Sequence, residues 1–120
     1  MRLKGFALSQ RMVVLPEYKT AYIYLSKEDL ARFNHKVGDT EGFVNMPLSV
    51  DGVVFSAFFM EKRNHIKISF RSKGDFDVNV FASKYFKGGG HKNASGGKSD
   101  LKMPECIEYF ESLLPGLVNP

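Results

Sequence analysis

The 120-residue chain is predicted to fold as one α+β domain, with a mixed sheet of about five strands and helices packed on it. Two apolar patterns lead to this prediction. Residues 53–60 are almost continuously apolar, which is typical of a strand covered on both faces and therefore central in its sheet. Residues 66–73 alternate instead, with Ile66, Ile68 and Phe70 on one face and polar side chains on the other.

The first eighteen residues are interpreted as a linker segment (1–18), and residues 19–120 as the folded domain. The linker includes a short strand near residues 11–15, which Pro16 would stop. The aromatic and β-branched run Thr20–Leu25 predicts the next strand.

Two helices are expected in the first half. Ser26 would cap one, with Asp29 as the acid of a capping box. Asp39 or Thr40 would cap a second, short helix ending near residue 48. The later elements are expected as a bend at 62–65, a helix over about 78–86 packing through Val80, Phe81 and Tyr85, a short strand at 94–99, and a helix from Pro104 to about Leu114.

Composition narrows the class of protein. Hydrophobic residues make up 43% of the chain and include 11 Phe, which is enough for a core. No apolar run approaches the ~18 residues of a membrane span, so no membrane partner is expected. The single cysteine, Cys106, excludes an internal disulfide and suits a reducing cytosol, so we expect a cytoplasmic protein. Because Cys106 lies in an apolar-patterned helix, we interpret it as a buried structural thiol.

Positive charge is concentrated in one part of the sequence. Residues 62–102 contain ten Lys/Arg and three Asp/Glu, whereas the rest of the chain contains seven and ten. The whole excess of the net charge of +4 therefore lies in this segment. Such a bias favours a polyanionic ligand, although a solvated basic surface is the alternative.

The same segment holds an unusual glycine run. Residues 88–97 (GGGHKNASGG) contain five glycines in ten positions. Glycine has no Cβ, so this run can turn sharply and approach a ligand closely. Its amide N–H groups would suit an anionic oxygen, and His91 and Lys92 add donors and positive charge. We interpret the run as a loop that holds a phosphate or a nucleotide.

Three ordered segments resemble signatures of the DHH-associated domain. They are 40–45 (TEGFVN), 69–73 (SFRSK) and 88–96 (GGGHKNASG). That domain is the substrate-binding half of DHH-family phosphoesterases, and the resemblance covers nearly the whole chain. It is strongest toward the oligoribonuclease (nanoRNase) and phosphoadenosine-phosphate phosphatase type, which is related to exopolyphosphatases. The family fold is likewise α+β.

The Asp-His-His motif that names the family is absent from this sequence. The three histidines, His35, His65 and His91, show no metal-ligand spacing with a carboxylate. We therefore expect no catalytic residue and no metal ligand here, and expect the chain to be the C-terminal domain of a larger enzyme. The resemblance implies a separate N-terminal DHH catalytic domain that carries two manganese ions. The isolated chain is predicted to be inactive.

Arg71 is the first candidate for phosphate contact, because a guanidinium group binds phosphate oxygens in a bidentate manner and a strand holds it still. The family resemblance implies the same contact, and a surface salt bridge is the alternative. His91 could bind a phosphate or a base, or could hold the glycine turn together. Tyr85 and Phe86 are candidates for stacking on a base. The remaining candidates for substrate binding are Ser69, Ser72, Gly88, Gly89, Gly90, Lys92 and Asn93.

Several of these candidates have open alternatives. Ser72 should point away from the face of Arg71 unless the strand ends there. Asn93 could donate to a ligand or occupy a left-handed turn, and Lys92 is interpreted as a general electrostatic contributor. Glu41 and Asn45 resemble family positions near the substrate cleft, but helix capping and polar contacts in the core explain them equally well.

Three functions are therefore considered. In the first, this domain grips the nucleotide end of a short oligoribonucleotide, pAp, or a linear or cyclic dinucleotide, which the partner domain hydrolyses. In the second, it is a non-catalytic RNA- or tRNA-binding module, as at the C-terminus of alanyl-tRNA synthetase, whose affinity for long RNA would depend steeply on salt. In the third, an exposed partner face makes the chain a homodimer without a ligand.

Overall fold

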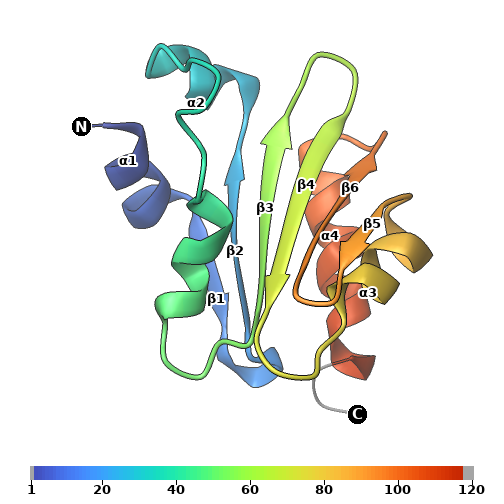
Figure 1. Cartoon of the computed structure of the whole chain (residues 1–120). Helices are drawn as coiled ribbons and strands as arrows, with labels where there is room; N and C mark the ends of the chain where they lie inside the picture. Colours follow the sequence, from blue (N-terminus) through green and yellow to red (C-terminus); the bar gives the residue numbers. More distant parts are fainter. Residues whose placement is uncertain (1, 118–120) are drawn as a thin grey trace.

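A computed structural model describes residues 2–117, which form one mixed β-sheet with helices on both faces (Figure 1). The elements in chain order are α1 (Leu3–Gln10), β1 (Met12–Leu15), the 3₁₀ helix η1 (Pro16–Tyr18), β2 (Thr20–Leu25), α2 (Lys27–Arg32), the 3₁₀ helix η2 (Phe43–Ser49), β3 (Phe55–Glu61), β4 (Ile66–Ser72), α3 (Val78–Tyr85), β5 (Gly89–His91), β6 (Ala94–Ser99), α4 (Met103–Leu113) and the 3₁₀ helix η3 (Leu114–Gly116).

The six strands are ordered β1-β2-β3-β4-β6-β5. β2 and β3 are parallel, and the other neighbouring pairs are antiparallel. The predicted α+β class with a mixed sheet is confirmed. The sheet has one strand more than the expected five. The additional strand is β5, a three-residue strand that pairs with β6 in a hairpin built from the glycine run.

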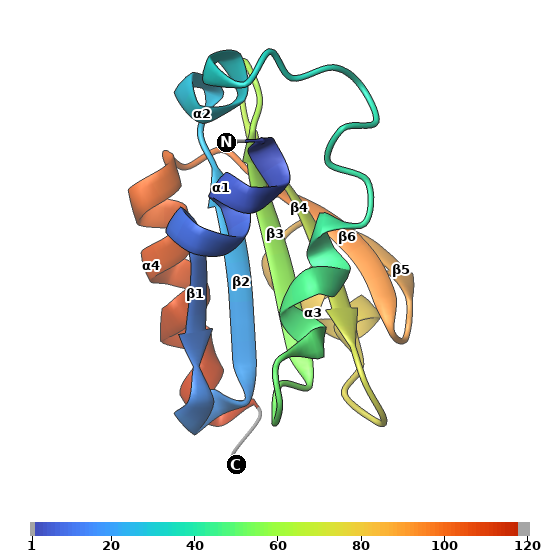
Figure 2. The same cartoon turned by 90° about the vertical axis from the view of Figure 1, so that its left-hand side faces the viewer.

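β3 is buried on both faces, as its continuous apolar sequence predicts. Phe55 and Phe59 pack into the larger core cluster with α3 and α4. Phe58 and Met60 pack into a second cluster, with α1, α2 and η2. Helices therefore cover both faces of the centre of the sheet, and Figure 2 shows α1 in front of the strands, with the chain after α2 looping outward before it returns as η2.

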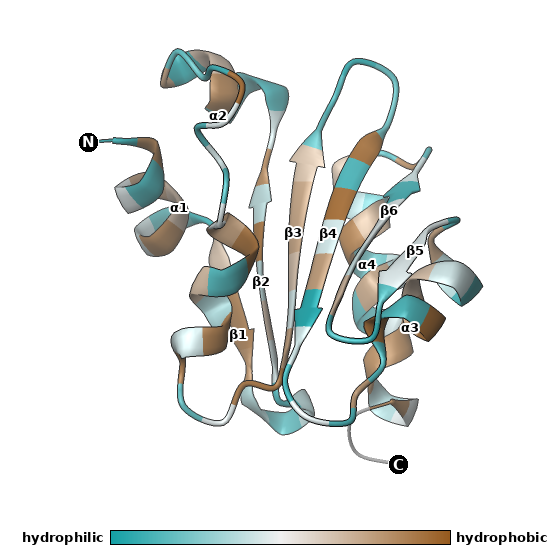
Figure 3. Cartoon of the chain, viewed as in Figure 1, coloured by the Kyte–Doolittle hydropathy of each residue, from teal (hydrophilic) through white to brown (hydrophobic). Residues whose placement is uncertain are grey.

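β4 packs into the larger core cluster through one of its two faces. Ile66, Ile68 and Phe70 are buried among the aromatic side chains of the larger cluster. The residues between them are polar, and the resulting alternation is visible as bands along β4 in Figure 3. This packing fixes the strand and points its polar side chains toward the opposite face of the sheet.

The N-terminal segment contains a helix that the sequence did not predict. Leu3, Phe6 and Ala7 of α1 are buried against the sheet, and β1 pairs with β2. No side chain caps α1, and its apolar pattern is weak, so burial on the sheet stabilises it more than local propensity does. The proposed boundary after residue 18 stays a prediction.

The capping box of Ser26 and Asp29 is confirmed, with reciprocal hydrogen bonds at the start of α2. The short helix expected after Asp39 is wrong in type and start. It is the 3₁₀ helix η2, which follows Gly42 at φ 84° and has no side-chain cap. The expected packing of Val80 is also wrong, because this side chain is 57% exposed on the outer face of α3.

Cys106 is fully buried, which agrees with its interpretation as a structural thiol. Burial raises the pKa of the Cys106 thiol, which keeps it protonated and unreactive at neutral pH. Across residues 2–117, no helix is long and apolar enough to cross a membrane.

Candidate nucleotide-binding site

A cavity of about 330 Å³ opens over the polar face of β4. Phe58 and Met60 of β3 contribute to its apolar lining. The chain between α2 and η2 forms one side, and β4 forms another. The residues that line it are His35, Val37, Gly38, Thr40, Glu41, Gly42, Val44, Phe58, Met60, Lys62, Lys67, Ser69 and Arg71.

Two of the predicted binding residues, Ser69 and Arg71, line this cavity from the same face of β4. The Arg71 guanidinium donates one hydrogen bond of 2.9 Å to the Phe70 carbonyl and makes no ion pair within residues 2–117. The salt bridge considered as its alternative role is therefore not found there. A partly buried arginine on a rigid strand, with donors to spare, suits a phosphate or carboxylate.

The charge of the cavity is mostly positive. Lys62, Lys67 and Arg71 line it together with a single carboxylate, Glu41. Glu41 belongs to the segment that resembles the family signature and lines the cavity, whereas Asn45 of the same segment does not. The cavity therefore combines an apolar base with a net positive rim, which is the character expected of a site for a phosphorylated aromatic ligand.

Lys73 continues the alternating pattern of β4 but has a structural contact. Its ammonium group donates a 2.6 Å hydrogen bond to the carbonyl of Leu48, at the end of η2. The Ser56 hydroxyl of β3 donates similarly to the carbonyl of Val44, at 2.6 Å. These two bonds fix η2 against the sheet, and with it one side of the cavity.

Ser72 points to the opposite face of β4, as the alternation predicted, and is buried. Its hydroxyl donates to the carbonyl of Phe76 at 2.6 Å and accepts a 2.9 Å hydrogen bond from the side-chain amide of Asn93. Asn93 donates a second bond to the carbonyl of Gly74, at 3.1 Å. Both side chains are used within the protein, which favours a structural role over ligand contact.

The glycine run is a β-hairpin and not an open loop. β5 and β6 pair from Gly89 opposite Gly96 to His91 opposite Ala94. The amide of Gly88 donates to the carbonyl of Ala82, and the amide of Gly90 donates to the side chain of Asn79 at 2.9 Å. These amides are therefore not open to an anion in this conformation, although substrate binding by Gly88, Gly89 and Gly90 stays a prediction.

Close packing explains two of these glycines. A Cβ on Gly97 would lie 2.8 Å from the Cβ and the carbonyl oxygen of Phe86, and one on Gly88 would lie 1.9 Å from the carbonyl oxygen of Gly96. Phe86 itself is 1% exposed, so its proposed role as a stacking platform is wrong. Tyr85 is partly buried and packs against the ring of Phe81, at 5.3 Å between centroids.

The sheet register brings His91 level with Arg71. Arg71 lies opposite Ala94, and Ala94 lies opposite His91, so the two residues stand two strand spacings apart, or about 10 Å. His91 is exposed and does not line the cavity. Lys92 forms an exposed ion pair with Asp75 at 3.2 Å, which leaves it a minor electrostatic contributor.

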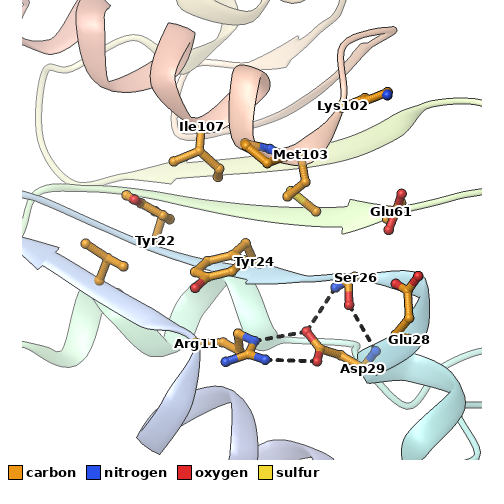
Figure 4. A pocket seen from close by; sticks show the side chains of 12 residues that line it. Arg11, Tyr22, Tyr24, Ser26, Glu28, Asp29, Glu61, Lys102, Met103 and Ile107 are labelled. Atoms are coloured by element: carbon orange, nitrogen blue, oxygen red, sulfur yellow. Dashed lines mark hydrogen bonds and ion pairs between the residues drawn. The ribbon is translucent and has the colours of Figure 1, made fainter.

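The larger cavity of the chain, about 800 Å³, lies elsewhere, between β1, β2 and α4 (Figure 4). Two of the charged residues that line it are paired with each other, because the Arg11 guanidinium makes two hydrogen bonds, of 3.0 and 3.1 Å, to the Asp29 carboxylate. The Tyr22 hydroxyl donates to Glu111, and burial, together with this bond, raises the pKa of Tyr22. None of the predicted binding residues lines this cavity, so the chemistry favours the smaller one.

Within residues 2–117, no group of three or more His, Cys, Asp or Glu side chains could hold a metal ion. The described residues therefore do not fit a manganese centre. What they can do is bind, orient and neutralise an anionic ligand.

Sequence reasoning missed His35 and Lys62 as cavity residues. His35 precedes the conspicuous segment 40–45 in a stretch without periodicity, and Lys62 was assigned to a hairpin bend. Only the three-dimensional approach of these segments to β4 brings the two residues to the site.

The mixed sheet, the polar face of β4 and the glycine hairpin are the features of a DHHA1 domain, as the family match shows. The DHHA1 domain family matches residues 17–115, and the chain belongs to this family. It is 33% identical over 96 residues to the bifunctional oligoribonuclease and PAP phosphatase NrnA of Bacillus subtilis (strain 168), a match that covers 80% of this chain and 29% of NrnA.

Solved structures of other proteins contain a domain similar to this chain. An exopolyphosphatase-related protein from Bacteroides fragilis superposes with a TM-score of 0.90 at 47% identity, over 94% of this chain and 33% of that one. The pGpG-specific phosphodiesterase PggH from Vibrio cholerae superposes with a TM-score of 0.66 over 94% of this chain and 37% of that one, and its 14% identity shows the shared fold alone. The chain thus spans about a third of the length of these relatives.

Proposed function

We propose that this chain is the substrate-binding half of a DHH-type phosphoesterase acting on short nucleotide substrates. The observation that carries the proposal is Arg71, a cation without an acidic partner among the described residues, held on a rigid strand beside Ser69 at a mainly positive cavity. Membership of the DHHA1 family supports the same role.

In this proposal the domain positions the substrate and supplies no nucleophile. Arg71 and Ser69 bind a terminal phosphate, the apolar surface of Phe58 and Met60 receives part of the nucleoside, and His91 contacts the ligand from the hairpin. Holding the scissile phosphate in place lowers the entropic part of the barrier for a reaction in the partner domain. That partner is a DHH catalytic domain, and manganese ions bound there would activate the water.

The proposed substrates are short 5′-phosphorylated oligoribonucleotides or pAp. The named activities of the Bacillus subtilis relative, oligoribonuclease and PAP phosphatase, support this choice. The small volume of the cavity, about 330 Å³, also suits one nucleotide end better than a long RNA.

The experiment is a titration of the chain with pApA at moderate salt, followed by amide NMR. Shifts centred on residues 67–73 and 88–97 are expected. An absence of shifts at millimolar pApA would contradict a preformed site on this half. Affinity that grows only with long RNA, regardless of its 5′ phosphate, would favour the RNA-binding module.

A second experiment tests the division of labour. The purified chain is incubated with pApA and manganese, and the products are separated by chromatography. No hydrolysis is expected, because the described residues offer no metal cluster. Manganese-dependent turnover by this chain alone would overturn the positioning role.

A further inference from the structure

Lys67 of β4 and Lys98 of β6 lie directly opposite each other in the antiparallel ladder. Opposed residues in such a pair point to the same face of the sheet, with Cβ atoms about 5 Å apart. This is the face that carries Ser69 and Arg71, since these residues alternate with the buried Ile68 and Phe70. Two ammonium groups are thus placed side by side on the proposed binding face.

The pair has no acidic partner within residues 2–117. Both lysines are exposed, and Lys62 lines the cavity close to Lys67. Of the neighbouring acids, Asp100 pairs with Lys87 at 3.5 Å, and Glu61 accepts the amide of Lys27 at 2.9 Å. Glu41 lines the same cavity as Lys67 but forms no ion pair with it. Like charges directly opposite each other are unfavourable in a sheet, and an anion between them removes the repulsion.

Only small side chains lie on β6 between this lysine pair and the level of Arg71. In the ladder, Ser69 lies opposite Gly96, and Arg71 lies opposite Ala94. A Cβ on Gly96 would have only the carbonyl oxygen of Ile68 nearby, at 3.3 Å, so no side chain covers this position. No large side chain of β6 therefore blocks the path along β4 from Arg71 to Lys67 and Lys98.

We propose that Lys67 and Lys98, assisted by Lys62, form a second phosphate subsite, so that a single-stranded oligonucleotide lies along β4 with its terminal phosphate at Arg71. This inference rests on the proposed function and adds where the rest of the substrate lies. Arg71 and Lys67 are four residues apart on a strand, or about 13 Å. A single-stranded oligonucleotide advances at least ~3.4 Å per nucleotide, so two to four nucleotides cover this length.

The subsite makes affinity depend on substrate length. pAp is too short to reach from Arg71 to the lysine pair, whereas a 5′-phosphorylated tetra-adenylate is long enough. Affinity of the chain is therefore expected to rise from pAp to pApApApA and to level off for longer oligoadenylates. A general basic surface would instead gain affinity steadily with length.

The experiment measures Kd for pAp and for pApApApA by calorimetry at two salt concentrations. In Lys98→Gln, which changes the lysine of the pair that does not line the cavity, the tetra-adenylate is expected to bind several-fold more weakly with a reduced salt slope, while pAp changes less than about twofold. Lys84→Gln is the matched control, because Lys84 lies on α3 over the ring of Tyr85. Melting of Lys98→Gln should be unchanged or higher, since a like-charge pair is removed.

The outcomes separate the two proposals. Equal loss for both ligands, equal loss in Lys84→Gln, or no loss in Lys98→Gln would overturn the second subsite, and the proposed function would stand as long as the wild-type chain binds pAp. Failure of the wild-type chain to bind pAp and pApApApA at all would instead overturn the proposed function. Loss confined to the longer ligand would establish the subsite.

Discussion

The side-chain amide of Asn93 donates a 2.9 Å hydrogen bond to the hydroxyl of Ser72, and so joins the hairpin turn between β5 and β6 to the end of β4. Both residues belong to segments that resemble family signatures, and both side chains make hydrogen bonds within the protein. The bond instead holds the hairpin that carries His91 in register with the strand that carries Arg71.

Replacing Asn93 by Ala should destabilise the chain. The change removes two hydrogen bonds and leaves the partly buried Ser72 hydroxyl with one partner fewer, so the free energy of unfolding should fall by about 1–2 kcal/mol. Urea denaturation followed by circular dichroism measures this loss. Asn64→Ala, in the exposed β3–β4 turn, is the matched control, and an equal loss there would contradict the structural role of Asn93.

Replacing Arg71 by Ala should weaken pApA binding at least tenfold, because a charge-assisted contact is lost. Stability should hardly change, since the hydrogen bond that the side chain makes within residues 2–117 goes to the neighbouring carbonyl of Phe70. Arg71→Lys should recover part of the affinity, since it keeps the charge and loses the bidentate geometry. Calorimetry and thermal melting measure both effects.

Arg63→Ala removes one exposed positive charge from the hairpin tip, outside the cavity, and serves as the control for Arg71. Arg71→Ala protein that melts like wild type and binds pApA equally well would refute the assignment.

Gly96 and Gly97 should respond differently to the same change. Gly97→Ala places a Cβ 2.8 Å from Phe86, which should lower the free energy of unfolding by about 1–3 kcal/mol. Gly96→Ala meets one oxygen at 3.3 Å and should cost less than about 1 kcal/mol, while it fills the low surface between Ser69 and the hairpin and weakens pApApApA binding. Paired denaturation and binding curves test this contrast, which similar stability losses in the two variants would contradict.

Asp29 should stabilise the fold in a pH-dependent manner. Burial alone would raise the pKa of this carboxyl group, but hydrogen bonds from Arg11 and from the Ser26 amide outweigh it and lower the pKa. The folded state thus holds the proton less tightly than the unfolded state. The stabilisation is present above pH ~4 and is lost as pH falls through the lowered folded value.

Asp29→Asn should therefore be less stable than wild type by about 1–2 kcal/mol at pH 7, with the difference shrinking below pH 4. Urea denaturation across pH 2–7 measures it. Asp51→Asn, in an exposed turn, is the matched control. A difference that stays constant down to pH 2 would show that the charge of Asp29 does not contribute.

Much of the fold followed from local patterns. The continuous apolar run of β3 predicted a central strand, and the alternation of β4 predicted a strand with one buried and one polar face. The capping box predicted the start of α2. These features depend on neighbouring residues and on burial preference, so they can be read along the chain. α1 and η2 have no side-chain cap, and packing on the sheet stabilises them instead. Their positions therefore could not be predicted from local patterns alone.

The sequence alone determined the family and the basic segment, and it predicted Arg71 as the leading candidate for ligand contact, because motif order, charge and residue chemistry can be read along the chain. Only the tertiary structure decided which glycines are required by packing, that Ser72 and Asn93 bond to each other, and that Lys98 stands opposite Lys67. These facts depend on strand pairing and register, which are set by contacts between residues far apart in the chain. The cavity at β4 is likewise made by segments 35–44 and 58–71, whose meeting no local pattern encodes.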